Sequence, residues 1–248
     1  MLDYVVLGAA AFFAGLLNTI AGGGTFLTFP ALVYTGVPLV AANATSAVAV
    51  FPGYLGGALG FRREIAAVER GKLLRMVLLT AIGGLAGSLL LLVSSEEIFA
   101  AIVPFLLVSA TLVFAFGDRL QKIASRVGQK EEGRPFGMIP VAIYGGYFNG
   151  GLGIVLLALF SLWGMRDLNV MNGLKNVLSF VLSLISVVTF AAAGIVAWPQ
   201  ALLMMIAATA GGYLGAPVAR MLPVKVVRAF IVLIGGLMSL GFLWRLLT

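Results

Sequence analysis

The chain has 248 residues, of which 61% are hydrophobic and only 10% charged, with a formal net charge of +7 and neither cysteine nor histidine. Soluble domains carry about 25% charged residues, so this composition predicts an integral membrane protein rather than a soluble binder of nucleic acid. Without cysteine or histidine, a thiolate metal site, a cysteine nucleophile and the usual general base are excluded, and we expect no enzyme, no metal and no cofactor.

The predicted membrane segments include two that are interrupted. Residues 3–36 form an apolar stretch cut by three consecutive glycines, and its start lacks the basic residues of a cleavable signal, so we expect it to be retained. Residues 136–164 form a second such stretch, cut by "GGYFNGGLG" at 145–153, and its arms are too short to cross a hydrocarbon core of about 30 Å. Six uninterrupted spans are predicted at 41–61, 73–93, 97–117, 168–193, 199–219 and 224–246.

The two halves of the chain resemble each other. "GLLN" at 15–18 corresponds to "GYFN" at 146–149, and "GGLAG" at 83–87 corresponds to "GGYLG" at 211–215. The pattern predicts a first repeat at 1–117, a cytoplasmic linker at 118–135 and a second repeat at 136–248, each repeat being a broken helical hairpin followed by three transmembrane helices. Internal repeats of this kind are typical of transporters.

The distribution of Lys and Arg indicates how the repeats are oriented. If each broken stretch enters the membrane and returns, or forms a pair of tilted short helices, the repeats are inverted and nearly all basic residues fall on one face. The positive-inside rule favours this arrangement over parallel repeats. We therefore expect an all-α polytopic membrane protein of two inverted repeats, with both termini outside the cytoplasm.

The glycine breaks are predicted to be hairpin tips near the middle of the membrane. Non-helical backbone is tolerated there only inside the protein or beside a watery cavity, and the N–H groups that begin each returning arm suit an anion. For the two asparagines at the tips, a local helix cap is an equally good interpretation. The candidate ligands are Asn18, Gly22, Gly23, Gly24 and Thr25 in the first half, and Asn149, Gly150, Gly151 and Gly153 in the second.

Lys175 lies well inside a predicted span. Intramembrane cations are costly and usually functional, although this lysine alternatively snorkels to the cytoplasmic interface. With Asn172, Asn176 and three serines at 179, 183 and 186 it forms one polar helical face, interpreted as the wall of an anion path, and the equivalent place in the first half carries Asn43, Thr45 and Ser46. No carboxylate lies deep in a span, which argues against a carboxylate proton relay and leaves proton or sodium coupling open.

Two stretches resemble a known family. "GLLNTIAGGGTFLTFPALVYTGVPLVAANATSAVAV" from residue 15 resembles the N-terminal signature of the sulfite exporter TauE/SafE family, and "GGYFNGGLGIVLLALFSLWGMRDLNVMNGLKNVLSF" from residue 145 resembles its second half. The resemblance implies a bacterial inner-membrane permease for sulfur-containing anions such as sulfite, sulfoacetate or other sulfonates, and it supports Asn18, the first glycine break, Lys175 and Asn176 as site residues.

The residues leave more than one class of function open. A secondary transporter that binds a small anion through the tip amides and Lys175 is the leading hypothesis. An anion channel of the same architecture, with continuous access from both faces, would use the same groups. A scaffold subunit would need neither paired helix breaks nor a buried lysine.

Overall fold

The computed structural model describes residues 1–20, 23–127 and 137–219, together with the single positions 229, 232, 233, 236, 237, 240, 241 and 244. Within these residues the chain forms helices joined by short turns, and no strand is present. Gly22 lies outside the described residues, as does most of the span predicted at 224–246.

The helices of the first half follow the predicted segments closely. They are α1 (Leu2–Ile20), α2 (Thr25–Tyr34), α3 (Leu39–Gly60), the short α4 (Arg62–Ala66), α5 (Arg70–Val93) and α6 (Glu96–Val127). The glycine break separates α1 from α2, as the sequence predicts. α6 continues beyond the expected span, so the first part of the segment predicted as a linker, from 118 to Val127, is helical.

The described part of the second half, like the first half, begins with a helical hairpin followed by longer helices. A short hairpin of α7 (Met138–Tyr147) and α8 (Leu152–Leu162) is followed by α9 (Leu168–Ala192) and α10 (Trp198–Ala219). The second glycine break therefore also separates two helices, whose lengths are 10 and 11 residues. At about 1.5 Å per residue, neither arm alone crosses a bilayer core.

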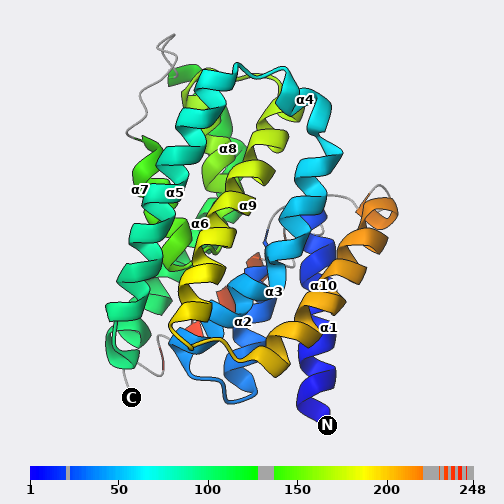
Figure 1. Ribbon diagram of the computed structural model, residues 1–248, viewed down its shortest axis with the longest axis vertical. Helices are drawn as coiled ribbons and strands as arrows, with labels where there is room; N and C mark the ends of the chain where they lie inside the picture. The colour runs from blue at the N-terminus through cyan, green and yellow to red at the C-terminus, as the bar shows by residue number, and fades with distance from the viewer. Residues whose placement is uncertain are drawn as a thin grey trace.

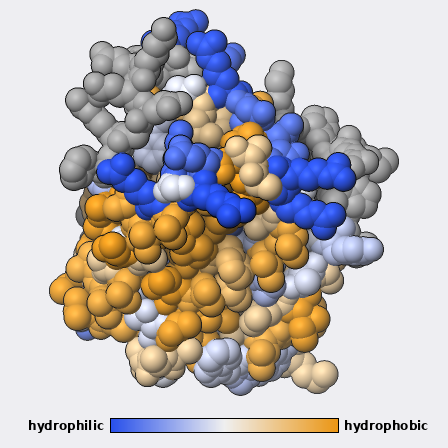
Figure 2. Space-filling model, turned by 45° about the horizontal axis from the view of Figure 1, so that its top comes forward, coloured by the Kyte–Doolittle hydropathy of each residue, from blue (hydrophilic) through white to orange (hydrophobic). Residues whose placement is uncertain are grey.

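The surface of the helices fits a lipid environment. By length and composition, three helices of the described chain are able to cross a membrane, namely α3, α5 and α9. The side chains of Leu74, Leu78, Ile82, Leu85 and Leu89 project from one exposed stripe of α5, at the spacing of one helical face. Figure 2 shows a broad hydrophobic belt below a hydrophilic end of the molecule, as expected for a multi-pass membrane protein.

The two hairpins open toward opposite ends of the helical bundle (Figure 1). The α1–α2 hairpin opens toward the end that holds the N-terminus, whereas the α7–α8 hairpin opens toward the end that holds α4. Between them α3 and α9 pack against each other and run in opposite directions (Figure 1). The exposed cations Arg62, Arg63 and Arg70 lie at the α4 end.

Each hairpin packs closely against a helix of the other half, with glycines at the points of contact. α1 packs along α10, where a Cβ at Gly15 would overlap the Ala208 carbonyl oxygen and one at Gly211 would overlap that of Phe12. These residues form the α1–α10 seam. α5 packs along α7 in the same way, with Gly87 against the Ile143 carbonyl and Gly146 against that of Gly84, which defines the α5–α7 seam.

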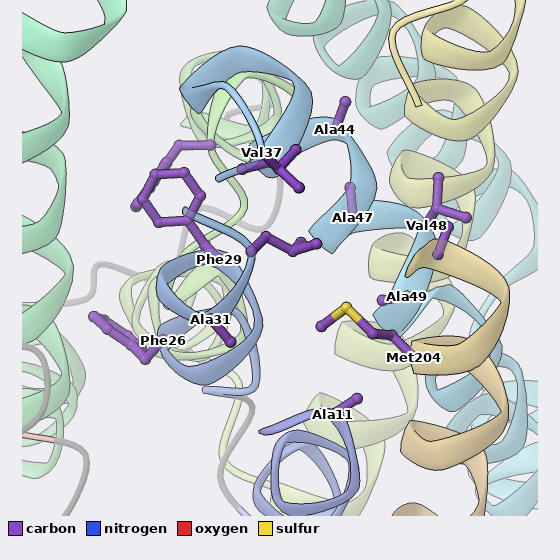
Figure 3. Packing of buried hydrophobic residues seen from close by; sticks show 14 of the residues in the cluster. Ala11, Phe26, Phe29, Ala31, Val37, Ala44, Ala47, Val48, Ala49 and Met204 are labelled. Carbon is purple, nitrogen blue, oxygen red and sulfur yellow. The ribbon is translucent and has the colours of Figure 1, made fainter. Parts of the chain in front are cut away.

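The middle of α3 forms the centre of the core. Every residue from Ala42 to Val50 is buried, because α3 is enclosed by α2, α9 and α10. Figure 3 shows small side chains, including Ala47 and Ala49, between the first hairpin with Phe29 and the α10 side chain Met204. Such small residues let helices approach closely where there is no water to drive their association.

Candidate substrate-binding site

The turn between α7 and α8, Phe148–Gly151, is called the second tip here and is fully buried. Asn149 and Gly151 both adopt positive φ, at 60° and 69°, a left-handed conformation that glycine and, less readily, asparagine accept. The Tyr144 hydroxyl donates a hydrogen bond to the Gly150 carbonyl oxygen. The glycines of "NGG" are therefore used to close a tight turn inside the protein.

Three helices surround the second tip. The Phe148 ring packs edge-on against Phe29 of α2, with ring centroids 5.9 Å apart. The backbone of Ala110 in α6 lies beside Gly151, where a Cβ would be 3.6 Å from its carbonyl oxygen. From α3, the buried Tyr54 side chain lies near the Asn149 side chain, although the two form no hydrogen bond. The tip thus lies where α2, α3 and α6 converge.

Several polar groups of the second tip have no partner among the described residues. Both amide atoms of Asn149 are buried and without a hydrogen bond, so the nearby Tyr54 hydroxyl does not complete one. The backbone N–H groups of Gly150, Gly151 and Gly153 are also without a partner, whereas Ile154 N–H bonds the Gly151 carbonyl at 3.0 Å. Buried polar groups left unpaired cost several kcal/mol in a membrane, so a ligand or water must satisfy them.

The first tip, Gly23–Gly24 in the described part, is held by local hydrogen bonds. The Asn18 side-chain oxygen accepts the Gly24 N–H at 2.8 Å, and the N–H groups of Phe26 and Leu27 bond the carbonyls of Gly23 and Gly24. Thr25 is buried beside them. Asn18 therefore acts as the local cap that was one of its two sequence interpretations.

Polar residues of α3 connect the two hairpins. The Asn43 side-chain nitrogen donates to the Tyr147 carbonyl oxygen at 2.7 Å, which ties α3 to the second hairpin. The hydroxyls of Ser46 and Thr28 lie 2.6 Å apart and tie α3 to the first. The Thr45 hydroxyl accepts the Ala197 N–H. Asn43 and Ser46 therefore bind α3 to the two hairpins, and Thr45 binds it to the turn before α10. All three were predicted as the counterpart of the Lys175 face.

Lys175 is buried on α9, with 8% of its surface exposed. Within the described part of the chain its ammonium has no hydrogen bond and no carboxylate partner. The hydroxyls of Ser179 and Ser183, one and two turns further along the same face, are buried and unpartnered. Ser186, at the end of this face, bonds Ser88 of α5 at 2.9 Å.

The two asparagines predicted beside Lys175 have other contacts. The Asn172 side chain donates to the Leu168 carbonyl oxygen of its own helix. Asn176 fills the space at Gly57 of α3, where a Cβ would lie 2.7 Å from the Asn176 amide carbon. Asn172 thus supports the first turn of α9, and Asn176 is part of the α3–α9 contact.

The register of α3 against α9 relates Lys175 to the second tip. Gly57 faces Asn176, and the ring of Phe51 stacks on Phe180 with centroids 5.0 Å apart. Tyr54 lies midway between these contacts, so it is level with residues 177–179 of α9. Measured along the axis of α9, Lys175 is therefore about one helical turn from the level of Tyr54, which lies near Asn149.

Sequence reasoning missed some residues that the structure brings to the tip. Tyr54 and Tyr144 are both buried or half-buried in apolar helices and both reach the second tip. The signal available in the sequence was a tyrosine inside a span rather than at its end, since membrane tyrosines usually lie at the interfaces.

The fold and the buried polar interior define a multi-pass helical membrane protein, and comparison with known proteins identifies its class as a membrane transporter. The chain belongs to the family described as "Sulfite exporter TauE/SafE", whose pattern matches residues 7–242. It is 28% identical to a "Probable membrane transporter protein" of Haemophilus influenzae, over 94% of this chain and 92% of the relative. It is 27% identical to the "Probable membrane transporter protein YfcA" of Escherichia coli K12, over 96% of this chain and 89% of the relative. No solved structure matches the chain significantly.

Proposed function

We propose that this protein is a permease for small sulfur-containing anions, such as sulfite, sulfoacetate or other sulfonates. The anion is bound in the membrane interior by hairpin-tip amides and by Lys175. One observation carries the proposal: a buried lysine without a counter-ion among the described residues shares a helix face with two serine hydroxyls that have no partner there. An uncompensated buried charge is strongly destabilising, and an anionic substrate removes that cost whenever it is bound.

The proposed architecture is a pair of inverted repeats. Support comes from the exchange of contacts between the halves. α1 packs on α10 just as its counterpart α7 packs on α5, and the counterparts α3 and α9 pack on each other. Further support comes from the opposite directions in which the hairpins open (Figure 1). Inverted repeats with broken helices at the membrane midplane are the usual framework of a substrate site in secondary transporters.

The second tip and Lys175 supply the chemistry that an anion needs. The unpaired N–H groups lie at the N-terminus of α8, an 11-residue helix, where the helix dipole favours negative charge. Lys175 adds a full positive charge about one helical turn along α9 from the level of Tyr54. A sulfonate or sulfite spreads its charge over three oxygens, so it can accept hydrogen bonds from several donors at once.

The proposed setting is a bacterial inner membrane, with the α4 end in the cytoplasm. Arg62, Arg63 and Arg70 are exposed at that end, while Glu96 and Glu97 are exposed in the first turn of α6 at the other end. Cytoplasmic loops carry the excess of Lys and Arg in membrane proteins. The N-terminus would then lie outside the cytoplasm.

The test is a binding panel of sulfite, sulfoacetate, taurine and thiosulfate, measured on purified wild type and on Lys175→Met. Loss of a charged hydrogen bond costs about 1.5–3 kcal/mol, so the variant should bind the preferred anion about 10- to 150-fold more weakly. Lys175→Arg should rescue poorly, because a guanidinium is larger and planar. The matched control is Lys72→Met, at the cytoplasmic start of α5. Equal binding by the Lys175→Met variant and the wild type would contradict the proposal.

Transport in vesicles separates a carrier from a channel of the same architecture. A carrier saturates with substrate and exchanges labelled for unlabelled anion across the membrane, whereas a channel does neither. Imposing a proton or sodium gradient in the same vesicles identifies the coupling ion. These measurements use the full-length chain reconstituted in lipid.

A further inference from the structure

The two hairpin tips are similar in sequence but differ in their hydrogen bonding. Each carries an asparagine before its glycines, yet Asn18 accepts the Gly24 N–H at 2.8 Å, while neither atom of the Asn149 carboxamide has a hydrogen bond within the described part of the chain. The difference is not one of exposure, because Asn149 is buried, with only 6% of its surface exposed. Local capping therefore accounts for the first asparagine and does not account for the second.

The backbone of the second tip fixes the direction of Asn149. At φ 60° the residue adopts the left-handed conformation, which glycine accepts most easily and asparagine less readily. A glycine here would close the turn at lower cost. Asparagine at this position, with its amide unpaired among the described residues, costs more than glycine in both backbone conformation and desolvation of a polar group, which is a pattern typical of ligand sites.

Tyr54 is the second side chain at this tip. It is buried on α3, between the contacts of Phe51 and Gly57 with α9, and it lies near the Asn149 side chain without completing a hydrogen bond. The N–H groups of Gly150, Gly151 and Gly153 have no partner among the described residues. With the Tyr54 hydroxyl and the Asn149 carboxamide they provide five donor groups in this turn and at the start of α8. A carboxylate has only two oxygens to accept them, whereas a sulfonate or sulfite has three.

We infer that Asn149 and Tyr54 determine specificity by binding the three-oxygen head of the anion at the second tip, and that Asn18 at the first tip is a structural cap. This assignment rests on the proposed function and adds to it the residues that distinguish a sulfur oxyanion from a carboxylate. Lys175 supplies attraction to any anion, and Tyr54 with Asn149 supplies the discrimination.

The experiment compares sulfoacetate with malonate, which replaces the sulfonate by a carboxylate on the same carbon framework. Tyr54→Phe removes only a hydroxyl, and Asn149→Gly removes the carboxamide while suiting the positive φ. Each variant should bind sulfoacetate about tenfold more weakly or worse and malonate nearly as the wild type does, so that the affinity ratio falls. Tyr147→Phe is the matched control, because that hydroxyl faces Ser94 instead, and Asn18→Gly should lower the melting temperature without changing the ratio.

The outcomes separate the two proposals. If the wild type binds sulfur anions and both variants keep the wild-type ratio, the assignment of Tyr54 and Asn149 is overturned while the permease function stands. If both variants bind sulfoacetate and malonate more weakly by the same factor, the two residues are structural and the assignment is again overturned. If the wild type binds none of the anions in the panel, the proposed function falls, and this assignment falls with it.

Discussion

Replacing Gly87 by alanine tests how tightly the α5–α7 seam is closed. The added methyl carbon would overlap the Ile143 carbonyl oxygen and lie 2.9 Å from both the Ile143 carbonyl carbon and the Tyr147 nitrogen. Ordinary contact begins at 3.4 Å, so the helices must separate by at least the 0.5 Å difference between these two distances. The atoms in the way belong to the backbone, which cannot turn aside as a side chain can.

The net effect on stability follows from two opposing terms. Alanine gains up to about 1 kcal/mol over glycine in a helix, whereas overpacking a close contact costs about 1–3 kcal/mol. Since the contact here is with backbone, we expect the upper part of that range and a net loss of about 1–2 kcal/mol. For a chain of this size each kcal/mol shifts the melting temperature by about 2–4 °C.

The assay is thermal unfolding of the purified protein in detergent, followed by circular dichroism. The matched control is Gly56→Ala on α3, where a Cβ would meet nothing within 4 Å, so only the helix gain remains and the melting temperature should rise slightly. A Gly87→Ala variant as stable as the Gly56→Ala variant would refute the close-packed seam. A destabilised variant should also bind substrate less well, because α7 leads directly into the second tip.

Two further predictions concern orientation and the tip itself. Reporter fusions at Met1 and at Arg126 should report opposite sides of the membrane, because Leu2 and Val127 are at opposite ends of the bundle, and reports from the same side would contradict the inverted arrangement. Gly151→Val should weaken anion binding in a protein that still inserts, since a β-branched residue is strained at φ 69°, whereas Gly56→Val should bind normally.

The helix breaks could be predicted from the sequence because glycine clusters interrupt an otherwise apolar stretch, and α2 and α8 indeed begin just after them. The far end of α6 could not, because hydropathy falls where charged residues begin at Asp118, while the helix itself continues to Val127. Hydropathy reports where a helix leaves the lipid, not where it ends.

The candidate site was predictable only in part. Lys175 and the serines share a face through helical periodicity alone, and both hydroxyls at 179 and 183 are indeed buried. The partner of Asn43 is a carbonyl 104 residues away, and no local pattern encodes such a contact. The same holds for Asn18 and Asn149, which both precede a glycine break in the sequence but differ in their hydrogen bonding. Whether these residues bind substrate stays a prediction.

The two seams have a consequence for how the chain is assembled. Each hairpin arm is enclosed by a helix from the opposite half, α1 by α10 and α7 by α5, so neither half contains the partner that its own glycines fit. In the proposed inverted-repeat arrangement α5 and α10 occupy corresponding places in the two halves, so a second copy of one half, turned over in the membrane, would offer an equivalent groove. An ancestral half-length chain could therefore have worked as a pair of oppositely inserted copies, and gene fusion would then have fixed their ratio and orientation in one polypeptide.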